Sequence, residues 1–169
     1  DLNIMQKGQT LGDITVRALT SLEDIIKKEK PNIVLVHGDT TTTFVGALAA
    51  FYNQVDIGHV EAGLRTYDKY SPYPEEMNRQ MVSCMADMHF APTKLSANNL
   101  IKEGKKKENI YITGNTVIDA MATTIKENYQ NEIFDWVGKD KMILLTAHRR
   151  ENIGDNMRSI FKAVKKIAE

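Results

Sequence analysis

Three acidic side chains stand at positions where a chain usually turns. Asp39 follows the apolar run NIVLVHG, and Glu61 follows the run VDIGHV. Glu75 follows Pro74 in the connection EAGLRTYDKYSPYPEE. A carboxylate that is partly removed from water has a raised pKa and is able to exchange a proton near neutral pH. One interpretation is therefore that the connection from Glu61 to Glu75 lines a site where protons move and that Asp39 faces a ligand at the end of its strand.

Each of these residues also has a plainer interpretation. Asp39 or Thr40 could cap the following helix, whose first N–H groups lack backbone partners. Glu61 could form an ion pair with Arg65. Glu75 and its acidic neighbour could stand where they do because a helix N-terminus favours negative charge. The sequence leaves these alternatives open, and the structure decides between them.

A second cluster carries positive charge. The run AHRRE places His148, Arg149 and Arg150 after an apolar run and before a helical pattern. Arginine clusters and helix N-termini both suit phosphate groups. The same side chains could instead form a surface ion-pair cluster with Glu151. The first interpretation predicts that His148, Arg149 and Arg150 bind the phosphate groups of a ligand.

Two further histidines are interpreted as structural. His89 lies within an apolar run, and His37 lies in a tight turn. No two His, Cys or Asp residues recur at a spacing typical of a metal site. Neither a Walker A pattern nor a G-x-G-x-x-G fingerprint is present. The sequence therefore predicts no metal ion and no redox cofactor.

Apolar runs and helical patterns alternate along the chain and must position these residues. Strands are expected at 32–39, 55–62, 88–93, 109–115 and 141–151, helices at 10–28, 40–52, 75–86, 96–103, 117–129 and 157–168, and irregular chain at 131–139. Parallel strands need crossover helices, so the pattern predicts an α/β fold, a Rossmann-like parallel sheet with helices on both faces. The first strand should then be buried on both faces.

The predicted fold explains why the candidate residues recur where they do. Ligands of open α/β sheets bind at the carboxyl ends of the strands, and each candidate falls at such an end or just beyond it. His59 and Glu61 are two residues apart, so both side chains point to the same side if their strand continues. The sheet is therefore expected to bring the carboxylates to one edge.

Composition narrows the class of protein. Among 169 residues, 22 Lys and Arg balance 22 Asp and Glu, which gives no reason to expect nucleic-acid or membrane binding. The single cysteine, Cys84, excludes an internal disulfide and suits a reducing, cytoplasmic location. No apolar run approaches the roughly 20 residues that span a bilayer. The first residue, Asp1, is not Met, and Glu169 falls in a helical pattern, so the chain is expected to be part of a longer one.

The ordered set of motifs is more specific than any of its members. The runs VHGDTTTT, GHVEAGLRT, SPYPEEMNRQ, FAPT, ITGNTVIDA and TAHRREN closely resemble the non-hydrolysing UDP-N-acetylglucosamine 2-epimerases across essentially the whole chain. The resemblance implies a GT-B-like fold with two Rossmann-like domains. It also implies interconversion of UDP-GlcNAc and UDP-ManNAc, through UDP elimination and a 2-acetamidoglucal intermediate, for bacterial surface polysaccharides.

The resemblance also assigns residues. It implies that Asp39, Glu61 and Glu75 are catalytic and that His148 is the cleft histidine. Asp39, Glu61, His148 and Arg149 would bind substrate, with Arg149 near a second, activating UDP-GlcNAc. No cofactor or metal is implied. The complete protein is expected to be a homodimer.

The chain departs from the family pattern at both ends. It lacks the family's first strand and the Gly-Thr-Arg-Pro-Glu turn, and it lacks the second half that carries most uridine and diphosphate contacts. We therefore expect most of an N-terminal domain at 1–130, a linker at 131–140 and the start of a C-terminal domain at 141–169. Alternatives are a hydrolysing epimerase that releases ManNAc and UDP, a GT-B glycosyltransferase, or a non-enzymatic folding or dimerisation unit.

Overall fold

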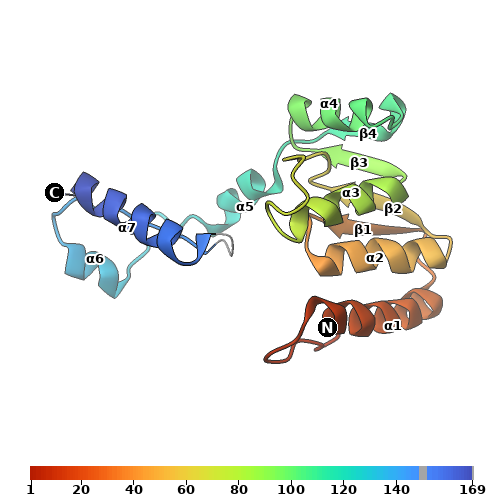
Figure 1. The fold of residues 1–169 in the computed structure, drawn as a ribbon, viewed down its shortest axis with the longest axis horizontal. Helices are drawn as coiled ribbons and strands as arrows, with labels where there is room; N and C mark the ends of the chain where they lie inside the picture. Colours follow the sequence, from red (N-terminus) through yellow and green to blue (C-terminus); the bar gives the residue numbers. More distant parts are fainter. Residues whose placement is uncertain (149–151, 169) are drawn as a thin grey trace. The chain divides into compact units, whose positions relative to one another are not determined.

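The computed structural model describes residues 1–148 and 152–168, and it divides into two compact units between Asp119 and Ala120. The first unit contains α1 (Leu11–Glu29), β1 (Ile33–His37), α2 (Thr41–Tyr52), β2 (Asp56–Val60), α3 (Glu75–Met85), β3 (Met88–Ala91), α4 (Lys94–Lys102), the 3-10 turn η1 (Lys107–Asn109) and β4 (Ile110–Ile112). Helix α5 (Thr116–Thr124) crosses the division, and α6 (Glu132–Val137) and α7 (Asp155–Ala168) follow it. Figure 1 labels the seven α-helices and the four strands among the described residues.

The first unit is built on one parallel sheet. Its strands lie in the order β1-β2-β3-β4, and each neighbouring pair is parallel. Parallel crossovers are almost always right-handed, so three successive crossovers between adjacent strands place α2, α3 and α4 on the same face. The ribbon shows these helices beside the strands that they connect (Figure 1). The predicted α/β class is confirmed.

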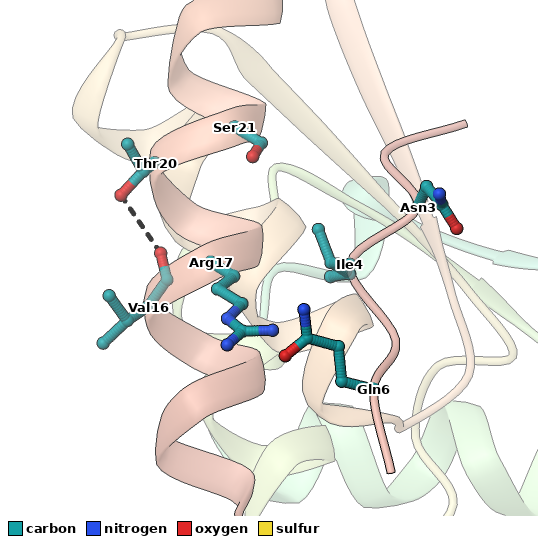
Figure 2. A pocket seen from close by; sticks show the side chains of 7 residues that line it. All are labelled: Asn3, Ile4, Gln6, Val16, Arg17, Thr20 and Ser21. Atoms are coloured by element: carbon teal, nitrogen blue, oxygen red, sulfur yellow. Dashed lines mark hydrogen bonds between the residues drawn. The ribbon is translucent and has the colours of Figure 1, made fainter. Parts of the chain in front are cut away.

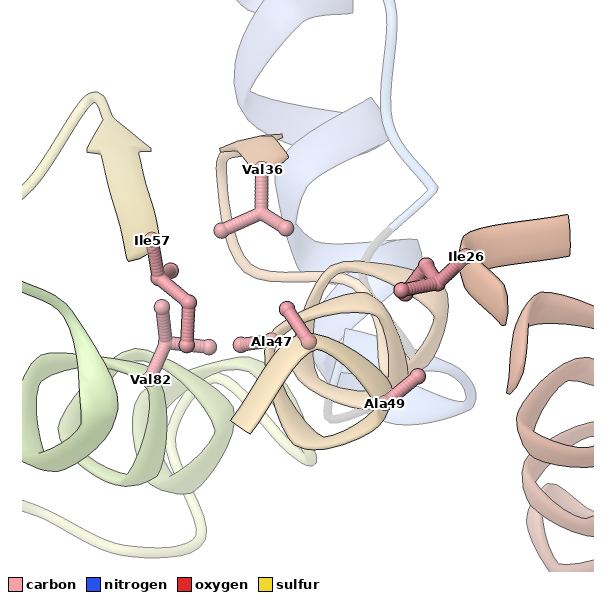
Figure 3. Packing of buried hydrophobic residues seen from close by; sticks show 7 residues of the cluster. Ile26, Val36, Ala47, Ala49, Ile57 and Val82 are labelled. Carbon is pink, nitrogen blue, oxygen red and sulfur yellow. The ribbon is translucent and has the colours of Figure 1, made fainter. Parts of the chain in front are cut away.

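The helix-covered face of the sheet carries the core. One cluster joins α1, β1, α2, β2 and α3 through the buried residues Ile26, Val36, Ala47, Ala49, Ala50, Ile57 and Val82 (Figure 3). The alanines of α2 are small enough for that helix to pack against α1, α3 and the sheet together. A second cluster of Ala62, Ala91, Ala97 and Leu100 seats α4. Together these clusters fix the helices whose ends carry the candidate residues.

The opposite face of the sheet is apolar but open among the described residues. Leu35 is 62% exposed and Tyr111 is 45% exposed. Gly58 lies between neighbours on this face, and a Cβ there would approach Leu35 Cδ2 to 2.6 Å and Phe90 Cε2 to 3.1 Å. The prediction that the first strand is buried on both faces is wrong for this chain. The crossover geometry places helices on one side, and no described segment of the first unit covers the other.

Helix ends follow the sequence signals closely in the first unit. The Thr10 side chain accepts from Asp13 N at 3.1 Å, while the Asp13 carboxylate accepts from Thr10 N at 2.9 Å, which is a capping box. Thr40 and Thr93 cap α2 and α4 without the reciprocal contact, each side chain accepting from the backbone N–H three residues on. The threonines before α1, α2 and α4 therefore set where these three helices begin.

The second unit departs further from expectation. Helix α5 ends at Thr124 rather than near residue 129, and α6 occupies chain that was expected to be irregular. Residues 141–148 form no strand, because no other strand among the described residues of this unit offers backbone partners. The predicted domain limits at 1–130, 131–140 and 141–169 stay predictions. None of the described helices has the length and apolarity to cross a membrane.

Candidate active site

The turn after β1 is held from three directions. Gly38 N donates to Val60 O at 3.0 Å, and Gly38 O accepts from the buried imidazole of His59 at 2.8 Å. Thr43 Oγ1 donates to His37 O at 2.6 Å. These contacts tie the end of β1 to β2 and α2. Whatever follows Gly38 is therefore presented at a defined place on the carboxyl edge of the sheet.

Asp39 is the residue that this turn presents. It does not cap α2, because Thr40 accepts from Thr43 N at 3.2 Å in that role. The Asp39 carboxylate instead accepts from Arg79 Nη2 at 2.7 Å and from Arg79 Nε at 2.9 Å. Both contacts reach Oδ2 and leave Oδ1 without an Arg79 contact. Thr40 rather than Asp39 therefore caps α2, and Asp39 remains a candidate catalytic residue.

Helix α3 faces this aspartate. Asn78 Nδ2 donates to Asp39 O at 2.8 Å, and Arg79 follows it along the helix. Residues three and four apart share a helix face, so Glu75 lies on the same face as Asn78 and Arg79. Glu75 is partly exposed and has no hydrogen bond or ion pair with the residues that the structure describes. Its carboxylate is available to a ligand at the Asp39 side of α3.

The second glutamate has a different environment. Glu76 is fully buried, and its carboxylate accepts from the backbone N–H groups of Thr66 and Tyr67, each at 3.1 Å. It also accepts from Gln80 at 3.1 Å and from Arg79 at 3.0 Å. Burial raises the pKa of Glu76, but these hydrogen bonds and the Arg79 charge outweigh burial and lower the pKa overall. Glu76 is an anchor for the connection rather than a surface charge.

Glu61 occupies a strained position just past β2. The strand ends at Val60, and Glu61 has φ 63°, a left-handed conformation that costs a non-glycine residue roughly 1 kcal/mol or more. The condition for His59 and Glu61 to point the same way is therefore not met. His59 is fully buried, whereas the Glu61 side chain is 24% exposed. Backbone strain held at a candidate carboxylate supports a functional position.

The turn at Glu61 directs its carboxylate toward the end of β1. Glu61 Oε1 lies 3.4 Å from His37 Nε2, and Oε2 lies 3.8 Å from where a Cβ on Gly38 would stand. The alternative partner, Arg65, binds Glu103 instead, through two contacts of 2.7 Å and 2.8 Å. Asp39 and Glu61 thus lie at the ends of adjacent strands, as the fold predicts.

His37 is a further candidate site residue, which the sequence analysis did not single out. It was interpreted as structural, but it ends β1, and its side chain is 57% exposed beside Glu61. Thr116 Oγ1 also lies 3.4 Å from His37 Nε2, so the segment after β4 reaches the end of β1. The missed signal was the position of His37 itself, at the carboxyl end of a strand. His89 is buried in β3 as predicted, and burial lowers its pKa to about 4.

The connection between Glu61 and Glu75 is anchored rather than loose. A Cβ on Gly63, which has φ 87°, would stand 2.2 Å from Ser96 O, so only glycine fits there. Asn99 Nδ2 donates to Gly63 O at 3.0 Å, and Arg65 donates to Ser83 Oγ at 2.9 Å. The connection is thus fixed to α3 and α4 at its start.

The other predicted site residues, His148 and Arg149, are not part of the first unit. His148 is exposed in the second unit, and the structure defines it only within that unit. Arg149 lies outside the described residues, so its predicted role stays a prediction. No three His, Cys, Asp or Glu residues gather to hold a metal ion in the described part of the chain. The carboxyl edge of the sheet therefore carries side chains suited to acid–base chemistry, and Arg79 is the cation that contacts Asp39 there.

A separate hollow lies between the N-terminal segment and α1 (Figure 2). Its volume is about 470 Å³, and it is lined by Asn3, Ile4, Gln6, Val16, Arg17, Thr20 and Ser21. Its only charged lining residue, Arg17, is exposed, and none of the predicted carboxylates lines the hollow. The arrangement that fits acid–base chemistry is the carboxyl edge of the sheet.

Comparison with known proteins shows which family this chain resembles. The family model described as UDP-N-acetylglucosamine 2-epimerase matches residues 1–169. The Bacillus subtilis UDP-N-acetylglucosamine 2-epimerase is 60% identical over 167 residues, which cover 99% of this chain and 44% of that protein. A structure of S. aureus MnaA with UDP is 61% identical with a TM-score of 0.89, over 94% of this chain and 44% of that one.

A ligand-bound relative adds to this comparison. The Neisseria meningitidis UDP-GlcNAc 2-epimerase bound to UDP-GlcNAc is 46% identical with a TM-score of 0.87, over 98% of this chain and 48% of that one. The chain therefore spans somewhat less than half the length of these relatives.

Proposed function

The chain belongs to the UDP-N-acetylglucosamine 2-epimerase family, and from this premise we propose that the protein containing it interconverts UDP-GlcNAc and UDP-ManNAc without releasing the free sugar. The observation that supports the proposal is the placement of Asp39, Glu61 and the Glu75 face of α3 at one carboxyl edge. Because the chain spans 44% of the Bacillus subtilis relative, the activity is proposed for the complete protein.

The reaction balances without a redox cofactor. The C1–O bond to UDP breaks, and UDP leaves with the electron pair while a base removes the proton on C2. The C2–H electrons form a C1–C2 double bond, which gives 2-acetamidoglucal. UDP then adds back at C1, and C2 takes a proton on its opposite face. Inversion at C2 thus requires an acid and a base on opposite sides of the sugar.

The carboxylates suit this reaction for a physical reason. No carbonyl group is attached to C2, so C1–O cleavage must run ahead of proton removal and positive charge develops at C1. Fixed negative charges near C1 stabilise that charge electrostatically. Asp39 is held in one orientation by Arg79, whereas Glu61 and Glu75 lack an arginine or lysine partner among the described residues. We propose that these three residues share charge stabilisation and proton transfer.

The departing diphosphate needs positive partners. Arg149 carries such charge and His148 can donate a hydrogen bond, and we propose that both approach the diphosphate in the complete protein, with Arg149 near a second, activating UDP-GlcNAc. A homodimeric state, a cytoplasmic location and a role in bacterial surface polysaccharide synthesis belong to the same proposal. A sigmoidal dependence of initial rate on UDP-GlcNAc, abolished in Arg149→Ala, tests the activating site.

Product analysis tests the proposal against its nearest alternative. The protein expressed from its complete reading frame is incubated with UDP-GlcNAc and followed by proton NMR. Appearance of UDP-ManNAc, with UDP and free sugar absent, is the expected result. Free ManNAc together with UDP identifies a hydrolysing epimerase instead. Unchanged substrate contradicts the proposal and favours a binding or folding role. The Glu75→Gln variant serves as the matched inactive control.

A further inference from the structure

Arg79 connects two carboxylates that lie on different segments. Its Nε and Nη2 atoms bind Asp39 after β1, and its Nη1 atom binds Glu76 in α3 at 3.0 Å. The Arg79 side chain is 10% exposed, and the Glu76 side chain is fully buried. A guanidinium presents its donors in a rigid planar fork, so one arginine fixes both carboxylates relative to each other.

Glu76 extends this link into the connection. Its two oxygens accept from Thr66 N and Tyr67 N, so its carboxylate holds the backbone midway between Glu61 and Glu75. A continuous chain of contacts thus runs from Asp39 through Arg79 and Glu76 to the backbone of the connection between Glu61 and Glu75. We call Arg79 and Glu76 the clamp. Charged hydrogen bonds of this kind are shorter and stronger than neutral ones and specify geometry well.

The clamp contacts or adjoins the segments that carry the three candidate carboxylates. Glu75 directly precedes Glu76, Asp39 receives Arg79, and the connection held by Glu76 begins at Glu61. Misplacement of a reacting group by about 1 Å can lower a rate roughly 100-fold. A clamp that fixes these segments would therefore act on the reaction without touching the sugar.

We propose that Arg79 and Glu76 are positioning residues that couple the Asp39 carboxylate to the connection between Glu61 and Glu75. The kinetic part of this inference rests on the proposed function, whereas the coupling itself does not. Lysine at position 79 keeps the charge but replaces the fork with a single point charge, so it cannot hold both carboxylates in the same geometry. This difference makes Arg79→Lys a sharp test.

Coupling is tested first, in a way that needs no turnover. In the protein from the complete reading frame, hydrogen exchange of the Thr66 and Tyr67 amides is measured by NMR for wild type and for Asp39→Asn. Asp39 does not touch either amide, so the expected increase in exchange, about threefold or more, reaches them only through the clamp. Unchanged exchange at both amides overturns the proposal, whether or not the protein is an epimerase.

Positioning is tested by kinetics on the same protein. Arg79→Lys is expected to lower kcat by about tenfold or more while KM changes by less than about threefold, because geometry rather than ground-state binding is lost. Guanidinium ion should partly restore kcat to Arg79→Gly. Arg158→Lys, at an exposed arginine that pairs with Asp155 in α7, is the matched control and should keep wild-type kcat.

The outcomes separate the two claims. A wild-type kcat in Arg79→Lys, or a loss that only follows the folded fraction and is not restored by guanidinium, overturns the positioning role. A wild-type protein that turns over no UDP-GlcNAc contradicts the proposed function, and the exchange measurement then decides the coupling alone.

Discussion

The carboxylate of Glu61 lies 3.4 Å from the imidazole of His37, across the ends of β2 and β1. Neither residue would meet the other if β2 continued, because the left-handed turn at Glu61 redirects its side chain. The pair joins a predicted catalytic residue to a histidine that was interpreted as structural. A histidine beside a proton-transferring carboxylate is placed to orient it or to share its proton.

His37 is therefore expected to act through Glu61. His37→Asn should lower kcat by about tenfold, less than the loss for a carboxylate that itself transfers the proton. The double variant with Glu61→Gln should be no slower than Glu61→Gln alone, because residues acting as a unit are not additive. Steady-state rates for the two single variants and the double variant complete the cycle. Independent, multiplying losses would show that His37 does not act through Glu61.

The three predicted carboxylates should each be required. Asp39→Asn, Glu61→Gln and Glu75→Gln keep size and shape but remove the charge, and each should slow epimerisation by about 100-fold or more. Glu108→Gln, at an exposed glutamate in η1, is the matched control with wild-type turnover. Any of the three variants that turns over near the wild-type rate removes that residue from the proton machinery.

Stability should fall as the pH falls below neutrality. Burial lowers the pKa of His89 to about 4, so the fold favours neutral His89 and its contribution is complete above the unfolded pKa of about 6.5. That contribution is lost as the pH falls from about 6.5 towards 4. Urea unfolding of wild type and His89→Gln at about pH 7 and pH 5 measures it. The variant should lose less free energy of unfolding between the two, and an equal loss would contradict the burial argument.

Protonation of Glu76 should also lower the free energy of unfolding, but at a lower pH than protonation of His89. Its pKa is lowered in the fold, so its contribution is present above the unfolded value near 4.5 and is lost as the pH falls through the folded pKa. Protonation would also weaken the contacts to Arg79 and to the Thr66 and Tyr67 amides. The protection of those two amides, measured relative to the intrinsic exchange rate at each pH, should therefore fall in acid before the protection of the α2 amides does. Simultaneous loss of protection throughout the unit would contradict this order.

The 169-residue chain by itself should not epimerise. It spans 44% of the Bacillus subtilis relative, and the family resemblance implies that most uridine and diphosphate contacts lie in the remaining part. Calorimetry should detect weak UDP binding at most, and NMR should show no UDP-ManNAc after incubation with UDP-GlcNAc. Micromolar UDP binding or appreciable turnover would mean that this chain holds a complete site.

The sequence predicted the fold better than it predicted the site contacts. Alternating apolar runs and helical patterns gave the parallel sheet, since crossover rules then restrict the topology. Side-chain partners were not predictable, because they depend on geometry across segments far apart in sequence. Arg79 reaches Asp39 forty residues away, and Arg65 binds Glu103 rather than the nearer Glu61.

The sequence also failed to predict where the backbone leaves a strand and hence where the side chains beyond it point. The period of two residues predicts where side chains point only while a strand continues, and β2 ends at Val60. The left-handed turn at Glu61 therefore could not be read from the apolar pattern. Likewise, the apolar run at 141–148 has strand character but no described partner strand in its unit, so it forms none. Glu75 and Glu76 look alike in sequence, and only the fold shows that Glu76 is buried and hydrogen-bonded whereas Glu75 is partly exposed.

Solvent exchange at C2 tests the central claim most directly. The complete protein is incubated with UDP-GlcNAc in deuterated water, and the UDP-ManNAc product is analysed by NMR and mass spectrometry. If carboxylates remove the C2 proton and return another on the opposite face, the product carries deuterium at C2. Product UDP-ManNAc that retains its original C2 hydrogen would contradict the account, because it would require internal hydrogen transfer rather than exchange through Asp39, Glu61 and Glu75.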